Sequence, residues 1–292
     1  MDGDVENTLA EALGKRWNEY RAQFKTCRRE FAEEAVHDLR VAARRLSAVL
    51  DILRAIHPHP GLQKMRRFLK GQLDNLDDLR DAQVMLVETS ETQESLPQLE
   101  TFREYLQKQE KRLLQATRKQ VQASRPSDWN RRIEKMHTAI IKESNEPDFS
   151  ARLLETMDKA YLKVAHLLGK LDRSKPATIH RLRIAFKKFR YMVASLSPEF
   201  TGLGKRELRA LALYQLRMGI LQDLEVMQRC LTGFVQEHKE MEPWLRPFGG
   251  RLRASRTRAL RSFLKSADDL FNFRPPGRAG TKAAIAPDRA AA

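Results

Sequence analysis

The sequence predicts an all-α fold built from two similar halves. Apolar residues recur three and four positions apart through most of the chain, the spacing that places them on one face of a helix. Only 13 Gly and 12 Pro occur in 292 residues, while 41% of the residues are hydrophobic and 32% are charged. This composition is typical of amphipathic helices around a buried core. Segments of the first half also recur in the second half, about 143 residues later, which indicates a duplicated helical unit.

The first half, residues 7–144, is expected to form five successive helices. The first covers 7–34, with a bend near its end. The second, from Val36 to Ile56, is stopped by the His-Pro-His-Pro-Gly turn at 57–61, because neither Pro nor Gly continues a helix. Further helices are expected at 62–89, 98–123 and 129–143.

The second half, residues 149–273, repeats this pattern after a polar linker at 145–148. Four helices are expected in this half. The first covers 149–170, the second runs from a cap at Thr178 to a stop at Pro198, and the last two cover 205–233 and 249–272. Two prolines predict an irregular segment at 234–248. The Pro-, Gly- and Ala-rich residues 274–292 are expected to form a disordered tail.

Two stretches carry the clearest duplication. One, Val36–Leu50, reads V-H-D-L-R-V-A-A-R-R-L-S-A-V-L, and the other, Ile179–Val193, reads I-H-R-L-R-I-A-F-K-K-F-R-Y-M-V. On a helix each has an apolar face and a second, almost purely cationic face. That second face holds His37, Arg40, Arg44 and Ser47 in the first copy and His180, Arg183, Lys187 and Arg190 in the second copy.

The cationic faces predict an anion-binding function. Like charges three and four residues apart on a helix repel by a few tenths of a kcal/mol per pair, so such a face costs stability unless an anion is bound. A solvated basic surface is the alternative interpretation of one copy alone. The repetition of the face, with a His at the head of each copy, favours anion binding.

A second duplicated segment follows each of these stretches. Leu79–Met85 reads L-R-D-A-Q-V-M and Leu221–Met227 reads L-Q-D-L-E-V-M. We interpret Asp81 and Asp223 as structural partners of basic residues, because no second acid or nucleophile repeats beside them. Whether the Asp74–Asp81 carboxylates or His57 and His59 bind a metal ion stays open, with ion pairing favoured for the former.

The duplicated stretches resemble the signature helices of the conserved histidine α-helical domain (CHAD) family. The forms H-x-x-R-V-x-x-R-R-L at His37–Leu46 and H-x-x-R-I-x-x-K-K-F-R-Y at His180–Tyr191 carry the resemblance, which extends over about residues 7–273. It implies two four-helix bundles related by pseudo-twofold symmetry, with the signature helices lining a basic central cavity. It also implies binding of inorganic polyphosphate, with other granule proteins as further partners, and localisation at polyphosphate granules in the cytoplasm.

The inner lining of the site is predicted from the resemblance and from helix geometry together. Arg45 and Lys188 belong to the motif but point about 100° away from the inner face, so they are expected at its rim or paired with acids. Arg67, Arg209 and Arg217 extend the basic surface along the next helices, with ordinary surface charge as the alternative. The expected polyphosphate-binding residues are His37, Arg40, Arg44, Arg45, Arg67, His180, Arg183, Lys187, Lys188, Arg190, Arg209 and Arg217.

The net charge supports a polyanionic partner without identifying it. The chain carries +16, of which residues 1–143 contribute +3 and the remainder +13. A module that binds the nucleic-acid backbone is therefore the alternative function. Aromatic residues make up only 7% of the chain and fall mostly on core faces, which disfavours base stacking.

Enzymatic chemistry is not expected. The sequence contains no phosphate-binding loop, no dinucleotide fingerprint and no E-x-E-x-K signature of triphosphate tunnel hydrolases; the nearest match, Glu240–Trp244, ends in Trp. Two cysteines, Cys27 and Cys230, have no metal-ligand spacing. We expect a cytoplasmic protein without cofactor or membrane span.

Overall fold

The computed structural model describes residues 3–93, 96–144, 148–196 and 198–275. Within these ranges the chain forms ten α-helices and four 3-10 helices and no strand, so the all-α prediction is confirmed. The expected linker and tail, residues 145–148 and 274–292, lie almost entirely outside the described residues. None of the described helices is long and apolar enough to cross a lipid bilayer.

The first half contains five α-helices, most of them close to the predicted ranges. They are α1 (Gly3–Glu30), α2 (Glu33–Ile56), α3 (Pro60–Gln93), α4 (Glu100–Ala123) and α5 (Asn130–Ser144), with 3-10 turns η1 (Pro97–Leu99) and η2 (Pro126–Trp129). The second half contains α6 (Phe149–Gly169), α7 (Pro176–Val193), the one-turn α8 (Pro198–Thr201), α9 (Lys205–Glu237) and α10 (Glu242–Lys265), with η3 (Lys239–Met241) and η4 (Ala267–Phe273).

The structure corrects the predicted end of the first helix and the predicted cap at Thr178. The expected helix at 7–34 ends at Glu30, because Phe31 takes a left-handed backbone with φ of 49°, which an α-helix does not accommodate. Thr178 is no cap: α7 already begins at Pro176, and the Thr178 hydroxyl donates back to the carbonyls of Asp172 and Lys175 at 2.9 and 2.7 Å.

The segment 234–248 is helical rather than irregular. Pro243 lies in the first turn of α10, where a missing N–H costs nothing. Pro247 removes one hydrogen bond inside the helix, but the neighbouring Leu245 and Phe248 are almost fully buried. Each buried side chain of this kind contributes about 1.5–3 kcal/mol, enough to offset the lost bond.

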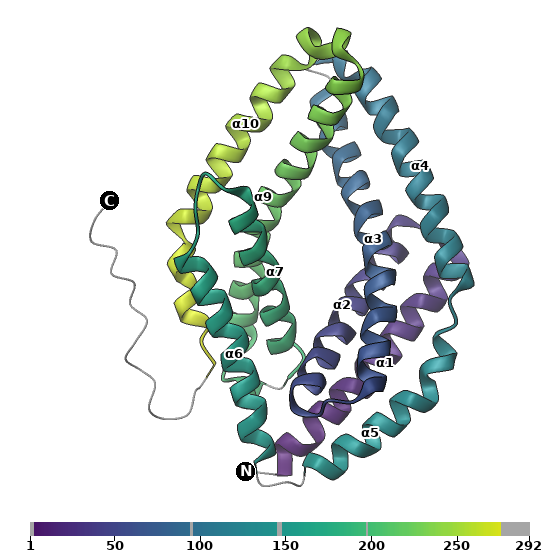
Figure 1. Cartoon of the computed structure of the whole chain (residues 1–292), viewed down its shortest axis with the longest axis vertical. Coiled ribbons are helices and arrows are strands. Elements are labelled where there is room, and N and C mark those ends of the chain that lie inside the picture. Colours follow the sequence, from purple (N-terminus) through teal and green to yellow (C-terminus); the bar gives the residue numbers. More distant parts are fainter. Residues whose placement is uncertain (1–2, 94–95, 145–147, 197, 276–292) are drawn as a thin grey trace.

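The helices frame a diamond-shaped outline (Figure 1). In the first half α1 packs on α2, α2 on α3 and α3 on α4; in the second half α6 packs on α7, α7 on α9 and α9 on α10. The halves meet where α2 contacts α7 and where α3 contacts α9. Counterpart helices of the duplication therefore lie together, although two symmetric bundles around a central cavity stay a prediction.

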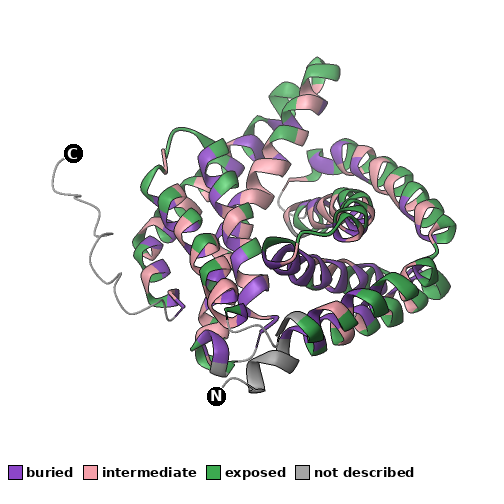
Figure 2. Ribbon diagram, turned by 60° about the horizontal axis from the view of Figure 1, so that its bottom comes forward, coloured by how far each residue is buried: buried purple, intermediate pink, exposed green. Residues whose placement is uncertain are grey.

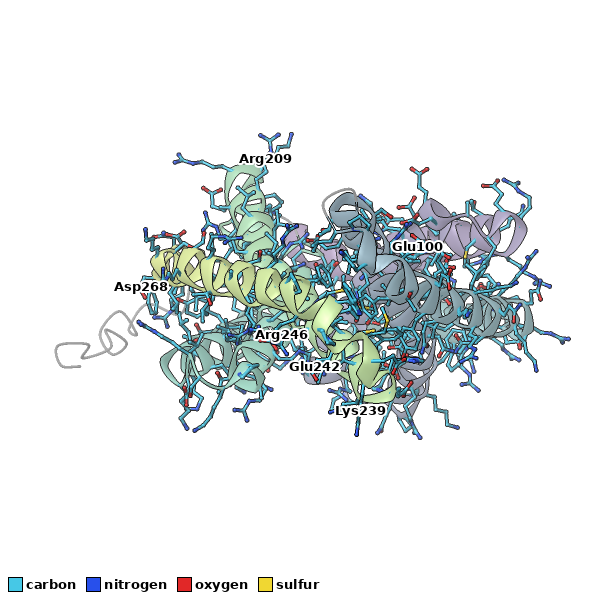
Figure 3. All side chains as sticks on the ribbon, turned by 90° about the horizontal axis from the view of Figure 1, so that it is seen from above. Glu100, Arg209, Lys239, Glu242, Arg246 and Asp268 are labelled. Carbon is cyan, nitrogen blue, oxygen red and sulfur yellow. The ribbon has the colours of Figure 1, made fainter. Side chains whose placement is uncertain are left out.

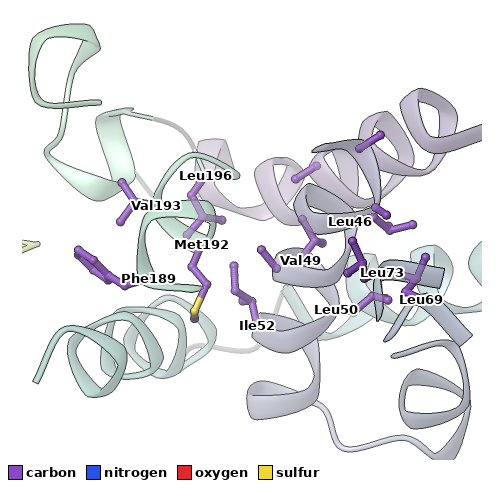
Figure 4. Packing of buried hydrophobic residues seen from close by; sticks show 14 of the residues in the cluster. Leu46, Val49, Leu50, Ile52, Leu69, Leu73, Phe189, Met192, Val193 and Leu196 are labelled. Atoms are coloured by element: carbon purple, nitrogen blue, oxygen red, sulfur yellow. The ribbon is translucent and has the colours of Figure 1, made fainter. Parts of the chain in front are cut away.

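Two apolar cores hold this arrangement. The larger core joins α1, α2, α3, α6, α7 and α9, and Figure 4 shows Met192 of α7 beside Ile52 of α2. The smaller core joins the ends of α3, α4, α9 and α10 around Phe102 and Phe234, whose ring centroids are 5.2 Å apart. The helices bury one side each and leave the other exposed (Figure 2), as their amphipathic sequences require.

Candidate functional site

The packing of α2 against α7 brings the two cationic faces together. Arg44 of α2 is close enough to Arg183 and Lys187 of α7 to lower the pKa of both. Arg40, one turn earlier on α2, also acts on Lys187. These four side chains are only partly exposed, because their helices bury the adjacent apolar faces in a shared core. The predicted convergence of the two signature helices is thus present at the level of charged side chains.

The helices α3 and α9 add carboxylates to this meeting point. Asp77 of α3 forms ion pairs with Arg44 and, at 3.5 Å, with Arg40. Asp81 of α3 and Asp223 of α9 lie near Arg183 and near each other. We refer to the whole set as the central charge cluster: Arg40, Arg44, Arg80, Arg183, Lys187, Asp77, Asp81 and Asp223.

The cations of α2 and α7 repel one another in the central charge cluster, and burial increases the cost of this repulsion. Arg80 has a carboxylate of its own, since it forms an ion pair with Glu33 at 3.3 Å. Lys187 shows the effect most strongly: burial first, then the nearby Arg44 and Arg183, lower its pKa from 10.5 to about 7. The pKa of Arg183 is lowered chiefly by burial, against the attraction of Asp223. Neither Arg183 nor Lys187 forms an ion pair within 4.0 Å with any described residue.

The pKa values of the two duplicated carboxylates, Asp81 and Asp223, are raised rather than lowered. Burial raises the pKa of Asp81, and the neighbouring Asp223 and Asp77 raise it further. Burial also raises the pKa of Asp223, while Arg183 and Arg80 oppose the increase. Both carboxylates lie near Arg183 but form no ion pair within 4.0 Å with a described residue, so their role as structural partners of the signature arginines stays a prediction.

The two signature histidines lie at the exposed ends of their helices. His180 shares a hydrogen bond of 2.6 Å between its Nδ1 and Gln222 Oε1 of α9. His37 has Arg80 and Arg40 nearby; burial and these two arginines lower its pKa below 6.5. Each histidine is thus positioned beside the second duplicated segment, at the counterpart positions Arg80 and Gln222.

Several predicted site residues lie outside the central charge cluster. Arg45, Arg67 and Arg209 are exposed, and Figure 3 shows Arg209 at an outlying end of the molecule. Arg217 pairs with Asp269 at 3.3 Å.

The remaining predicted residues have protein partners of their own. Lys188 pairs with the buried Asp51 at 3.2 Å, which matches the expectation that it points away from the inner face. Arg190 donates to Gln215 Oε1 at 2.9 Å and lies 5.2 Å from the centroid of the Tyr191 ring. Ser47, its counterpart in the first copy, is buried.

Comparison with known proteins identifies the family. The family profile of the CHAD domain matches residues 11–232, about three quarters of the chain. The chain belongs to the CHAD domain family. The crystal structure of the CHAD domain from the plant Ricinus communis has a similar fold, with a TM-score of 0.61 and 22% sequence identity over 92% of this chain and 90% of that one. A comparison with curated proteins found no match.

In this CHAD domain the sequence alone did not reveal the role of Asp77 and Arg80. Arg80 stands in the duplicated L-R-D segment, where its counterpart is Gln222, so that repeat was the available signal. A cavity of about 620 Å³ between the start of α7, α9 and α10 also went unpredicted; its cationic lining comes from Arg229, Arg253 and Arg256. A small adjoining hollow shares Pro176 and Glu225 with this cavity and reaches His180 and Arg183.

The described residues of this CHAD domain contain no group of three or more His, Cys, Asp or Glu side chains placed to hold a metal ion. The rings of His57 and His59 stack with centroids 6.1 Å apart, and His59 Nδ1 accepts a hydrogen bond from the Gly61 N–H. Asp74 pairs with Lys70 at 2.8 Å and Asp77 with the two arginines. The Asp74–Asp81 carboxylates for which contacts are known thus act as ion-pair partners.

Proposed function

We propose that this CHAD domain binds inorganic polyphosphate, without catalysis, at the central charge cluster. CHAD domains as a family are associated with polyphosphate binding. The observation that carries the proposal is the convergence of Arg40, Arg44, Arg183 and Lys187 from two duplicated helices, where burial and mutual repulsion lower the pKa of Arg40, Arg183 and Lys187. A folded protein keeps such a repulsive cluster at a cost in stability, which a bound polyanion removes.

The chemistry of the cluster suits a chain of phosphates. Arg side chains bind phosphate oxygens through forked hydrogen bonds, and Lys supplies a point charge. The Nε atoms of Arg40 and Arg44 are buried and form no hydrogen bond with the described protein groups. The exposed His37 and His180 can donate to phosphate oxygens at one end of the cluster.

A flexible polyanion bound at the central charge cluster would be able to extend into the cavity of about 620 Å³. It adjoins the hollow beside His180 and Arg183, and Arg229 and Arg253 on its lining are exposed. A ligand longer than the cluster would therefore meet further cations towards α10. This arrangement favours a long chain over a single phosphate group.

The competing ligand is nucleic acid, which a basic protein also attracts. Fluorescently labelled long-chain polyphosphate, duplex DNA and single-stranded DNA would be titrated at the same moderate salt concentration. We expect polyphosphate to bind at least about tenfold more tightly, a difference of about 1.4 kcal/mol. Equal affinity for either nucleic acid would replace this proposal with the nucleic-acid module.

A matched pair of variants tests the location of the site. The cluster variant replaces Arg40, Arg44, Arg183 and Lys187 by Ala, and the control variant replaces four exposed cations of α4 by Ala: Lys108, Lys111, Arg112 and Lys119. Both remove four positive charges. Charge-assisted hydrogen bonds contribute about 1.5–3 kcal/mol each, so we expect the cluster variant to lose about 100-fold or more and the control only a few-fold. Similar losses in two folded variants, as judged by circular dichroism, would exclude the cluster as the site.

Two further parts of the proposal have separate tests. Incubation with polyphosphate and a divalent metal ion should release no phosphate, since the described residues provide no catalytic set; measured release would show an enzyme. A fluorescent fusion should colocalise with polyphosphate granules and with other granule proteins, and the cluster variant should not. Diffuse fluorescence of the wild-type fusion in cells that contain granules would contradict this localisation.

A further inference from the structure

A groove lies on the side of α7 that faces away from the central charge cluster. It is bounded by α6, α7 and the C-terminal part of α2, and its volume is about 690 Å³. The α7 residues on its lining include Arg181, Ile184 and Lys188, which occupy a different face of the helix from Arg183 and Lys187. The groove is therefore a separate feature from the proposed polyphosphate site.

Small and branched apolar side chains form part of the lining of this groove. Ala160 of α6, Ala185 of α7 and Ala55 of α2 line it with methyl groups, which permit close approach of a helix backbone. Ile184 is 53% exposed beside them. Its counterpart in the first copy, Val41, is more covered, so the duplication alone does not explain an exposed Ile at this position.

Cations from three helices also line the groove. Lys159 and Lys163 project from α6, Arg181 and Lys188 from α7, and Arg54 from the end of α2. The lining has one carboxylate, Asp51, which is buried and already held by Arg66 at 2.8 Å and Lys188 at 3.2 Å. The groove thus combines apolar side chains with cations from three helices, of which Lys159 is already paired with Glu155 at 2.7 Å.

The length of the groove matches a short helix. Its lining runs from Thr156 to Leu167 on α6 and from Arg181 to Met192 on α7. Each of these stretches has twelve residues, and its eleven rises of about 1.5 Å give about 16 Å, or about three helical turns. On each wall the lining residues follow helical spacing, so the groove is a regular trough between two helices.

We propose that this groove docks an acidic amphipathic helix of a partner protein. The apolar side chains of the docked helix, at i, i+4 and i+7, would cover Ile184 and the alanines. Carboxylates on both flanks would pair with the cations of α6 and α7. This is the helix-in-groove mode of peptide recognition, in which charge complementarity requires a negatively charged partner.

Other occupants fit the groove less well. Polyphosphate gains nothing from an apolar floor, since it has no apolar surface to bury. A fatty acid requires a cation at one end of an apolar tunnel, whereas the lining of this groove has cations from α2, α6 and α7. The distribution of charge thus selects a ligand with acids on two sides of an apolar stripe.

The test uses two synthetic peptides of the same composition and about 15 residues, long enough for partial helicity in water. The first places Leu and Ile on one helical face with Glu on both flanks, and the second is its scrambled isomer. Binding is measured by fluorescence anisotropy at about 0.15 M salt, where the Debye length of about 8 Å limits non-specific attraction. We expect the amphipathic peptide to bind at least tenfold more tightly than the scrambled one.

Two variants locate the contact. Ile184→Glu places a negative charge on the floor, and Val87→Glu makes the same kind of change at another side chain that is also 53% exposed. I184E should weaken the amphipathic peptide at least tenfold, and V87E less than twofold, while both keep wild-type affinity for polyphosphate. Exposed positions tolerate such changes with little loss of stability, and circular dichroism would verify folding.

Several outcomes would overturn the proposal. Equal binding of the two peptides would show general charge attraction, and absence of binding would show that the groove accepts no acidic helix. Equal effects of I184E and V87E would place the peptide elsewhere. Stoichiometric binding of laurate that I184E abolishes, with no peptide binding, would identify a site for a small amphiphile.

Discussion

The charge state of Lys187 should make the affinity for polyphosphate depend on pH. Burial and the neighbouring Arg44 and Arg183 lower its pKa to about 7, so the free protein holds this side chain half neutral at pH 7. A polyanion beside it stabilises the charged ammonium and raises its pKa. Binding therefore takes up a proton, and the affinity for polyphosphate falls as the pH rises above 7.

The size of the effect follows from the protonated fraction. With a pKa of about 7, this fraction is about one half at pH 7 and about 3% at pH 8.5, so the affinity should fall about fifteenfold between these values. The long polyphosphate chain itself changes little in charge, since it has only two ends.

The perturbation is Lys187→Arg, because Arg stays charged throughout this range. Anisotropy titrations with labelled polyphosphate at pH 7.0, 7.75 and 8.5, at constant ionic strength, should show the fifteenfold decline in wild type and a nearly flat profile in K187R. His180→Gln is the control and should keep the decline. A wild-type profile as flat as that of K187R, or a decline of the same size in K187R, would refute the role of Lys187.

Three other predictions concern individual charges. Lys187→Met should raise the free energy of unfolding by about 1–3 kcal/mol at pH 7, because the cost of the buried charge disappears. The pKa of Lys187 is lower in the folded protein than its unfolded value of 10.5, so the stability of wild type should rise between pH 7 and 10. The stability of K187M should not rise in this way. Asp77→Asn should tighten polyphosphate binding several-fold while lowering the melting temperature, because Arg40 and Arg44 lose their ion-pair partner; unchanged affinity in calorimetry would contradict it. Asp51→Asn should destabilise the fold by about 1–3 kcal/mol in urea titrations, because it leaves two cations around a buried position, and wild-type stability of this variant would show that the pairs contribute nothing.

Local signals accounted for most of the fold. The apolar periodicity and the Pro-Gly stop at 57–61 predicted the end of α2 at Ile56, since both depend on residues near in sequence. The break after Glu30 was less predictable, because nothing in the local pattern shows that Phe31 adopts a positive φ. Pro247 misled the prediction for the opposite reason: distant packing of Phe248 stabilises a helix that local propensity disfavours.

Only the part of the site that lies on the two duplicated helices could be predicted from the sequence. The duplication showed two matching cationic faces, and the resemblance to the CHAD signature helices implied that they line one site; the structure brings Arg44, Arg183 and Lys187 together. The contribution of Asp77 depends on how α3 is rotated against α2, and tertiary packing sets that rotation. The sequence pattern likewise does not predict that Lys188 pairs with Asp51, which lies 137 positions earlier in the chain.

The duplication also shows which half should hold the ligand more tightly. In the first half, Asp77 neutralises part of the charge of Arg40 and Arg44, whereas its counterpart 142 residues later is Gly219. The cations of α7 thus lack the close carboxylate that those of α2 possess. We expect the double variant Arg183→Ala, Lys187→Ala to lose more polyphosphate affinity than Arg40→Ala, Arg44→Ala, by about tenfold or about 1.4 kcal/mol in matched titrations. The reverse order would mean that Asp77 releases its arginines to the ligand at little cost, and equal losses would mean that the two halves share the polyanion evenly.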